Sequence, residues 1–315
     1  KAVGDNIILQ GEAWNFTDLP INEAPVKGHI ANYPHGINLA VFNDSTRDSY
    51  LGKIHEKGFV QGNYDFTDVC RAGIIGNIID YYSKSVSIDV YHRFAYSPNE
   101  NLQYLSIHDG FTLWDKINLT YDGDMKKRIE LAKFSLGMLL TSQGKIILQG
   151  GTEIGLTKPL GEKHHPEDPE SDRAHTSEFI NLDDDLGNIT HYHENSYSSS
   201  DFVNKIRWGR KDHILFSNLY RYSSGLIKLR RHANAFRYST SENIKKGLKF
   251  ILEDDFNAYR VIAYTLDNTL EYSYGSGIER IPYRKFVVVH NGSFETLKLK
   301  DDEFFSEMDI LVDSK

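Results

Sequence analysis

The chain has 315 residues, of which 40% are hydrophobic, and a formal net charge of -8. This length supports one large domain with a smaller one beside it. No apolar run approaches the ~20 residues of a membrane-spanning helix, and the acidic balance argues against nucleic acid as the main partner, so we expect neither a membrane nor a nucleic-acid partner.

The start of the chain and its single cysteine each support one expectation. The chain opens at Lys1 and enters a strand-like stretch at residues 6–10. Because a buried strand rarely begins a domain so abruptly, we expect that a further segment precedes Lys1, so that the chain is a fragment or a processed product.

Cys70 is the single cysteine, which excludes an intrachain disulfide, and it is expected to pack as a small apolar side chain. No compartment is indicated.

Four apolar runs are each followed by polar side chains, which is the pattern of strands that deliver functional groups to loops. The runs cover residues 6–10, 37–42, 102–107 and 146–149. The residues that follow them include Glu12 with Trp14, Asn43 with Arg47, His108 with Asp109, and Glu153. In a parallel α/β barrel, catalytic side chains stand where strands end and the loops before the helices begin. A competing interpretation is that His108 and Asp109 only end a strand and cap a helix.

Helical patterns lie between and after these runs, at residues 68–82, 124–143 and 214–232, with Asp124 as a predicted N-cap. Strands that alternate with helices indicate an α/β fold with a parallel sheet. Four such units in about 150 residues match half of an eight-stranded α/β barrel, whose typical length is ~250 residues.

A polar loop is expected over residues 157–201. Its histidines and aspartates have no standard zinc spacing, and Pro166 and Pro169 break regular structure. We therefore predict a solvated loop in preference to a metal site. The residues in question are His164, His165, Asp168, Asp172 and His175.

From about Asn243 the hydrophobic period changes from helical to alternating. Strands are predicted at residues 248–252, 258–265, 284–290 and 296–299, separated by turns rich in Asp, Asn and Gly. This pattern predicts a small antiparallel β-sandwich.

The predicted chemistry depends on Glu12, His108 and Asp109 together. Hydrolysis of a glycosidic bond needs a carboxylic acid that protonates the leaving oxygen, and negative charge or hydrogen bonds around an oxocarbenium-like transition state. Glu12 stands beside Trp14, and apolar surroundings favour a carboxyl group that holds its proton. We interpret Glu12 as a candidate acid/base, Asp109 as a group that steadies the distorted sugar, and His108 as a hydrogen-bond partner of sugar hydroxyls.

Seven stretches occur in the order expected of one enzyme family. They read GEAW, AVFNDSTRD, GFVQGN, SIHDGFTLWDKI, LLTSQGKIILQGGTEIGLTK, NSYSSSDFVNKIRW and GLIKLRRHANAFR. From about Asn6 to Arg237 the chain therefore closely resembles the type I pullulanases of glycoside hydrolase family 13, in the α-amylase superfamily. The resemblance implies a hydrolase that cleaves α-1,6 links in branched α-glucans such as pullulan, amylopectin and glycogen-derived dextrins.

The resemblance also assigns roles to individual residues. It implies that Glu12 is the acid/base, that Asp109 stabilises the transition state, and that His108 and Trp14 contact substrate. Asn195 and Tyr197, with Asp201 and Asn204 after them, match one wall of the substrate cleft. The implied fold is barrel strands five to eight over residues 1–240, followed by a C-terminal β-sandwich over 241–315.

The chain departs from the family pattern at three places. The nucleophilic aspartate and a neighbouring arginine of the family precede GEAW. Before Glu12 this sequence has no arginine, and its one aspartate, Asp5, lies at the wrong end of the predicted strand. Leu156 replaces an arginine of the family, and the insert at 162–194 is longer than expected. The resemblance therefore implies that the nucleophile comes from an N-terminal half of the enzyme or from a second copy of the chain.

The sequence is also compatible with two other functions. The missing nucleophile is compatible with a non-catalytic carbohydrate-binding or structural module. Another specificity of the superfamily, such as isoamylase or α-1,4 hydrolysis, is disfavoured by the FNDSTRD and HDGFTLWDK stretches. No cofactor is expected; calcium is compatible with the chain, but no residue pattern indicates it.

Overall fold

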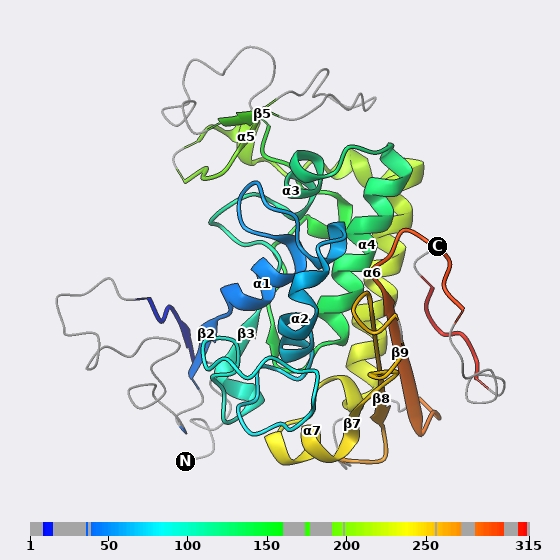
Figure 1. Ribbon diagram of the computed structural model, residues 1–315. Helices are drawn as coiled ribbons and strands as arrows, with labels where there is room; N and C mark the ends of the chain where they lie inside the picture. The colour runs from blue at the N-terminus through cyan, green and yellow to red at the C-terminus, as the bar shows by residue number, and fades with distance from the viewer. Residues whose placement is uncertain are drawn as a thin grey trace.

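Four short parallel strands form the first sheet, and described helices follow β2, β3 and β4 along the chain. The computed structural model describes residues 9–14, 36, 39–159, 174–176, 191–197, 199–255, 257–271, 281–298 and 308–313. The sheet has the order β1-β2-β3-β4, so its strands lie side by side in the order of the sequence (Figure 1). The strands are β1 (Leu9–Gly11), β2 (Leu39–Phe42), β3 (Asn101–Gln103) and β4 (Lys145–Ile146).

The chain has an α/β fold, as predicted. The helices of the described ranges are α1 (Asp44–Leu51), α2 (Thr67–Ile74), α3 (Leu113–Thr120), α4 (Met125–Thr141), α5 (Asp201–Asn204), α6 (Ile214–His232) and α7 (Ser241–Gly247). Short 3₁₀ helices are η3 (Phe59–Gln61), η4 (Tyr64–Phe66), η5 (Pro98–Glu100), η6 (Thr152–Ile154), η8 (Trp208–Asp212) and η9 (Asn234–Phe236). None of the helices described is long and apolar enough to cross a membrane.

Helices α4 and α6 confirm the helices predicted at residues 124–143 and 214–232. Asp124 caps α4 as predicted, because its carboxylate accepts a hydrogen bond of 2.7 Å from the backbone N–H of Lys127. The two helices pack side by side between the parallel strands and the second sheet (Figure 1). Apolar side chains at helical spacing thus form the middle of the core.

The predicted helix at 68–82 is wrong in its second half. Helix α2 ends at Ile74, and the backbone then turns through the left-handed region at Gly76 (φ 73°) and Asn77 (φ 57°). The side chain of Asn77 is buried, with hydrogen bonds of 2.7 Å from Asn43 and 3.0 Å from Asn101. This polar cluster joins the ends of α2 and β2 to the start of β3, and its bonds compensate for a conformation that asparagine tolerates better than most residues.

The second sheet is antiparallel, with the order β7-β8-β9. Its strands are β7 (Leu248–Ile251), β8 (Val261–Asp267) and β9 (Lys285–Asn291), close to three of the predicted positions. Residues 296–298 are irregular, so the fourth predicted strand is wrong over that part. One cluster of buried side chains includes Val41, Leu136 and Tyr264, and this core is therefore continuous between the two sheets.

The predicted loop at 157–201 contains a short antiparallel pair, β5 (Ala174–Thr176) with β6 (His191–His193). His164, His165, Asp168 and Asp172 lie outside the described residues, and of His175 only the backbone pairing is described. Cys70 is buried as expected, with its thiol 3.5 Å from the carbonyl oxygen of Ser49.

Candidate active site

Glu12, His108 and Asp109 come together beyond the carboxyl ends of β1 and β3. Both strands pair in parallel with β2, so their carboxyl ends point to the same edge of the sheet. One side-chain ligand atom from each of the three residues lies within 4.8 Å of the other two. The three predicted residues therefore form a cluster in space, although Glu12 precedes His108 and Asp109 by about a hundred positions in the sequence.

The route from β3 to this cluster differs from the prediction. Hydrogen-bonded pairing ends at Gln103, and Tyr104 to Ile107 continue as a buried but irregular segment. Gly110 then turns the chain with φ 74°, and Thr112 caps α3 by accepting a bond from the N–H of Asp115. Since Thr112 is the cap, the interpretation in which His108 and Asp109 cap a helix is wrong.

His108 and Asp109 face each other at the surface of the site. The Nε2 atom of His108 is 3.4 Å from Oδ2 of Asp109, and the two side chains are 51% and 46% exposed. The ring of Phe42 meets the imidazole edge-on at 6.4 Å between centroids. About half of the surface of each of these two side chains is therefore covered by neighbouring residues, and the rest is accessible to a ligand.

Tyr197 and Asn195 lie against Asp109. Asn195 forms an isolated antiparallel bridge with Asp109 through the backbone. The hydroxyl of Tyr197 donates a hydrogen bond to Oδ1 of Asp109, and its ring lies 5.7 Å from the imidazole of His108. The Oδ1 atom of Asn195 is buried and accepts no hydrogen bond within the described structure, so it is a candidate acceptor for a ligand hydroxyl.

Asn204 of α5 holds the loop of residues 195–199 in shape. Its amide nitrogen donates to the carbonyl oxygens of Ser196 (3.0 Å) and Ser199 (3.1 Å), and its oxygen accepts from the Ser196 hydroxyl (2.8 Å). Asn204 therefore positions the loop that carries Asn195 and Tyr197. Asp201 begins α5 and is exposed.

Glu12 and Trp14 lie at the open side of the site. Glu12 is exposed, and Trp14 is half-buried two positions further along the chain. The apolar enclosure that we expected around Glu12 is wrong for the described structure. The physical reason is that β1 pairs only with β2 here, so no described strand covers its other side.

Sequence reasoning did not assign roles to Arg47 and Tyr104, which lie directly behind the cluster. The guanidinium of Arg47 donates to the Tyr104 hydroxyl (3.3 Å) and lies over its ring at 5.6 Å. It is also paired with Asp48 at 2.7 Å. Burial raises the pKa of Tyr104, and the negative charges of Asp48 and Asp109 raise it further. The FNDSTRD stretch was the signal in the sequence that could have identified Arg47. Because α1 begins at Asp44, Arg47 lies in the first turns of this helix and its side chain reaches Tyr104, just after β3.

Asp115 and Lys158 support the other side of the site. Asp115 is fully buried and accepts bonds from the hydroxyl of Thr157 (2.5 Å) and the N–H of Lys158 (2.8 Å). Burial raises the pKa of Asp115 to about 6, although these bonds oppose the rise. The ammonium group of Lys158 lies 3.5 Å from the carbonyl oxygen of His108. The start of α3 and the segment after η6 therefore fix the peptide that carries the imidazole.

The same cluster has the donor types of a cation site. Glu12, His108 and Asp109 would each offer one ligand atom. Calcium takes six to eight oxygen ligands, whereas this set contains two carboxylates and one imidazole. The described residues thus suit proton transfer and sugar binding better than a calcium site.

No family model matches the chain. It is 26% identical over 299 residues to a pullulanase of Bacillus subtilis (strain 168), covering 93% of the chain. The resemblance to pullulanases is confirmed. Pullulanase A of Streptococcus pneumoniae serotype 2 is 27% identical over 80% of the chain.

Solved pullulanase structures agree with this result. The pullulanase from Bacillus acidopullulyticus superimposes with a TM-score of 0.68 at 26% identity over 92% of the chain. The pullulanase from Paenibacillus barengoltzii, in complex with maltohexaose and alpha-cyclodextrin, gives a TM-score of 0.68 at 26% identity over 93%.

The chain spans only part of the pullulanases that it matches. It covers 33% of the Bacillus subtilis protein, 20% of the Streptococcus pneumoniae protein, and 29% and 37% of the two solved chains. The matched region therefore carries only a portion of what a complete pullulanase contains.

Proposed function

We propose that this chain supplies one part of the active site of an α-1,6-glucan debranching hydrolase that acts with retention of configuration. The single observation that supports the proposal best is the meeting of Glu12, His108 and Asp109 at one edge of a parallel sheet, in a chain similar to pullulanases. A glycosidase needs this combination of a proton donor and groups that bind a distorted sugar.

In this proposal Glu12 protonates the glycosidic oxygen as the bond to the anomeric carbon breaks. A carboxylate nucleophile attacks that carbon and forms a covalent glycosyl intermediate. Glu12, now deprotonated, takes a proton from water, whose oxygen attacks the same carbon and releases the sugar and the nucleophile. Asp109 and His108 hold the hydroxyls of the distorted ring, and these contacts tighten at the transition state.

The nucleophile comes from outside this chain in the proposal. The carboxylates that the described structure gathers at the site are Glu12 and Asp109, and both have other roles. A retaining enzyme places its nucleophile about 5 to 5.5 Å from the acid/base. An N-terminal half of the enzyme or a second copy of the chain would provide that carboxylate beside the edge of β1 that no described strand covers.

The proposed architecture follows from the same idea. Strands β1 to β4 would be strands five to eight of a (β/α)8 barrel over residues 1–240, and residues 241–315 would form the C-terminal β-sandwich. The parallel order β1-β2-β3-β4 and the three-stranded antiparallel sheet support this division. The exposed edges of half a barrel also favour a partner that closes it.

The proposed substrate is a branched α-glucan such as pullulan, amylopectin or a glycogen-derived dextrin. Tyr197 and Asn195 would form one wall of its binding cleft, and Trp14 would contact it on the side of Glu12. The complexes of solved pullulanases with maltotetraose and with maltohexaose support a glucan ligand. No cofactor takes part in the proposed reaction.

The test is to restore the missing part in trans. The preceding portion of a pullulanase chain is added to this chain, and reducing ends released from pullulan are measured. We expect hydrolysis only in the mixture, and a loss of about 10²- to 10⁴-fold in Glu12→Gln. Glu295→Gln, at an exposed carboxylate beyond β9, is the control and should retain activity.

A non-catalytic carbohydrate-binding module is the second candidate, favoured by the lack of a third carboxylate within the described cluster. Glucan binding by this chain without any hydrolysis in the mixture would support the module and reject the hydrolase. Cleavage of α-1,4 links alone would instead assign another specificity of the superfamily.

A further inference from the structure

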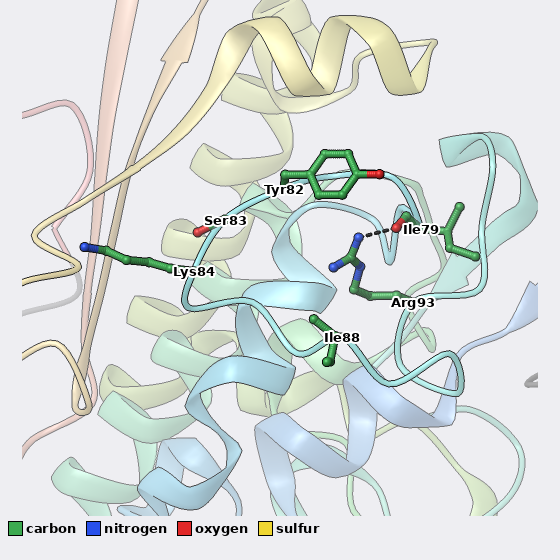
Figure 2. A pocket seen from close by; sticks show the side chains of 6 residues that line it. All are labelled: Ile79, Tyr82, Ser83, Lys84, Ile88 and Arg93. Carbon is green, nitrogen blue, oxygen red and sulfur yellow. Dashed lines mark hydrogen bonds between the residues drawn. The ribbon is translucent and has the colours of Figure 1, made fainter.

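A pocket of about 580 Å³ lies far from the candidate active site. It is formed within the segment between α2 and β3, and its lining residues are Ile79, Tyr82, Ser83, Lys84, Ile88 and Arg93 (Figure 2). This segment precedes β3, whereas His108 and Asp109 follow that strand. The pocket is therefore near the amino ends of the parallel strands, beside α7 and β7, at the opposite end of the sheet from the site (Figure 1).

The wall of the pocket is fastened to the second sheet at several points. Tyr81 is buried, and its hydroxyl donates to the carbonyl oxygen of Leu248 at 3.0 Å. The hydroxyls of Ser83 and Ser85 both donate to Glu253. A loop held by so many bonds keeps its shape, so the pocket is preformed.

Tyr82 and Ile88 are apolar groups that the fold leaves in solvent. Their exposed fractions are 88% and 85%, although the adjacent Tyr81 is only 4% exposed. Because Tyr81 secures the backbone, the ring of Tyr82 is presented at the mouth of the pocket at a defined place. An exposed aromatic ring in a fixed position is a platform for a flat apolar surface.

Arg93 forms the polar part of the pocket. Arg93 is only 6% exposed. Its Nε atom donates to the carbonyl oxygen of Ile78 at 3.1 Å, and its Nη2 atom donates to the carbonyl oxygen of Ile79. The Nη1 atom has no partner among the described residues. Figure 2 shows the guanidinium between Tyr82 and Ile88, where this remaining nitrogen can donate to a ligand oxygen.

The charges around the pocket disfavour an anionic ligand. Lys84 is paired with Asp254 at 2.5 Å, and Lys245 with Asp80 at 2.5 Å. Asp80 also acts on Arg93 through its negative charge. Glu253, which accepts from the serine hydroxyls, adds a further carboxylate. A neutral ligand that combines an apolar face with hydroxyl groups suits this environment best.

We propose that the pocket binds a glucose unit of an α-glucan chain, as a second carbohydrate site separate from the candidate active site. The C–H face of the sugar would stack on Tyr82, its edge would contact Ile88, and its hydroxyls would accept from Arg93 Nη1 and bond to Ser83. The choice of glucose rests on the proposed function, because a debranching enzyme gains substrate concentration from a second contact with the same polymer.

The test is titration calorimetry of the 315-residue chain with maltohexaose, in a background that carries Tyr197→Ala to weaken the candidate active site. Tyr82→Ala should weaken the remaining binding at least about tenfold, since burial of a large apolar side chain contributes ~1.5–3 kcal/mol and 1.4 kcal/mol is tenfold. Tyr82→Phe keeps the ring and should bind within about twofold of the parent chain.

Tyr96→Ala is the matched control, because Tyr96 is an exposed tyrosine (49%) that does not line the pocket. It should bind like the parent chain. Because Tyr82 is almost fully exposed, its removal should leave the melting temperature unchanged, and this is checked in parallel. Equal affinity in Tyr82→Ala and the parent, or absence of maltohexaose binding in both, overturns the proposal.

The two proposals fail in different ways. Tyr82→Ala should leave hydrolysis of a short branched oligosaccharide by the reconstituted mixture unchanged and lower only the hydrolysis of amylopectin. If the mixture shows no hydrolysis but Tyr82 still governs maltohexaose binding, the proposed function fails and the second site stands. If hydrolysis of amylopectin and binding are both insensitive to Tyr82, the second site fails alone.

Discussion

The hydroxyl of Tyr197 donates a hydrogen bond to Oδ1 of Asp109, although the two residues come from segments 88 positions apart. The backbone bridge between Asp109 and Asn195 brings the same two segments together. His108 approaches the other carboxylate oxygen, Oδ2, at 3.4 Å. Each oxygen of Asp109 thus has its own side-chain neighbour, and a fixed orientation is what a group that holds a distorted sugar requires.

Tyr197→Phe removes one of these contacts and keeps the ring. We expect kcat/KM on pullulan to fall about tenfold in the reconstituted mixture, because a hydrogen bond to a charged group contributes ~1.5–3 kcal/mol. The melting temperature should not change, since Tyr197 is 59% exposed. Tyr96→Phe is the control at another exposed tyrosine. Unchanged kcat/KM in Tyr197→Phe would show that the bond does not position Asp109.

Arg230→Lys should destabilise the chain by about 2 kcal/mol, because hydrogen bonds to a charged group contribute ~1.5–3 kcal/mol. The Arg230 guanidinium lies at the end of α4 and donates to four carbonyl oxygens, and an ammonium group cannot span the same set. Urea unfolding measures the effect. The acceptors are Leu140 (3.1 Å), Ser142 (2.6 Å), Phe236 and Gly144 (2.8 Å).

Arg231→Lys is the matched control, because the adjacent side chain is exposed. Its effect should lie within about 0.5 kcal/mol, as is usual for surface substitutions. Equal stability of the Arg230→Lys chain and this control would show that the four hydrogen bonds of the Arg230 guanidinium add nothing to stability.

The stability of the chain should depend on pH through His290. The imidazole is buried against Phe134 and Tyr264, and its Nε2 atom is 3.1 Å from the hydroxyl oxygen of Thr141. Burial lowers the pKa of His290 to about 3 from its ordinary value of 6.5. Below pH 6.5 the unfolded state therefore binds a proton that the folded state rejects, and stability falls as the pH falls toward 3.

The expected loss from this group between pH 7.5 and pH 5 is about 2 kcal/mol. Asp115 acts in the opposite direction, because its pKa of about 6 in the fold is above the ordinary 3.8, so stability rises as the pH falls from 6 toward 3.8. The difference between the parent chain and His290→Gln cancels that contribution. This difference should shrink on acidification, whereas it should stay constant if His290 does not titrate as stated. Exposed His55→Gln is the control.

Asn43→Ala tests the buried asparagine cluster at the start of α1. Its amide nitrogen reaches Asn77 (2.7 Å) and Asn101 (3.0 Å), and its oxygen caps α1 by accepting from the N–H of Thr46 (3.2 Å). We expect a loss of about 3 kcal/mol, the sum of a lost cap and of buried oxygens left without a donor.

Asn63→Ala removes a comparable cap that lies at the surface, at the start of η4. Its cost should be about 1 kcal/mol. If the two variants unfold at the same urea concentration, the cluster adds nothing beyond an ordinary cap.

Patterns of local spacing determined the parts of this protein that depend on near neighbours in the chain. Helix α6 has the predicted bounds, and α4 has the predicted cap, because helical periodicity and capping act within a few residues. The polar residues after the apolar runs at 6–10 and 102–107 were recognisable for the same reason. The order of motifs along the chain by itself indicates pullulanases.

Only the tertiary structure decided where those elements stop and what they touch. Helix α2 ends early because Asn77 is more stable as the centre of a buried polar cluster than as a helical residue, and its partners are distant in sequence. The contact of Tyr197 with Asp109 and the support of Tyr104 by Arg47 also join separate segments. Such contacts depend on how the chain closes its long loops, which local spacing does not encode.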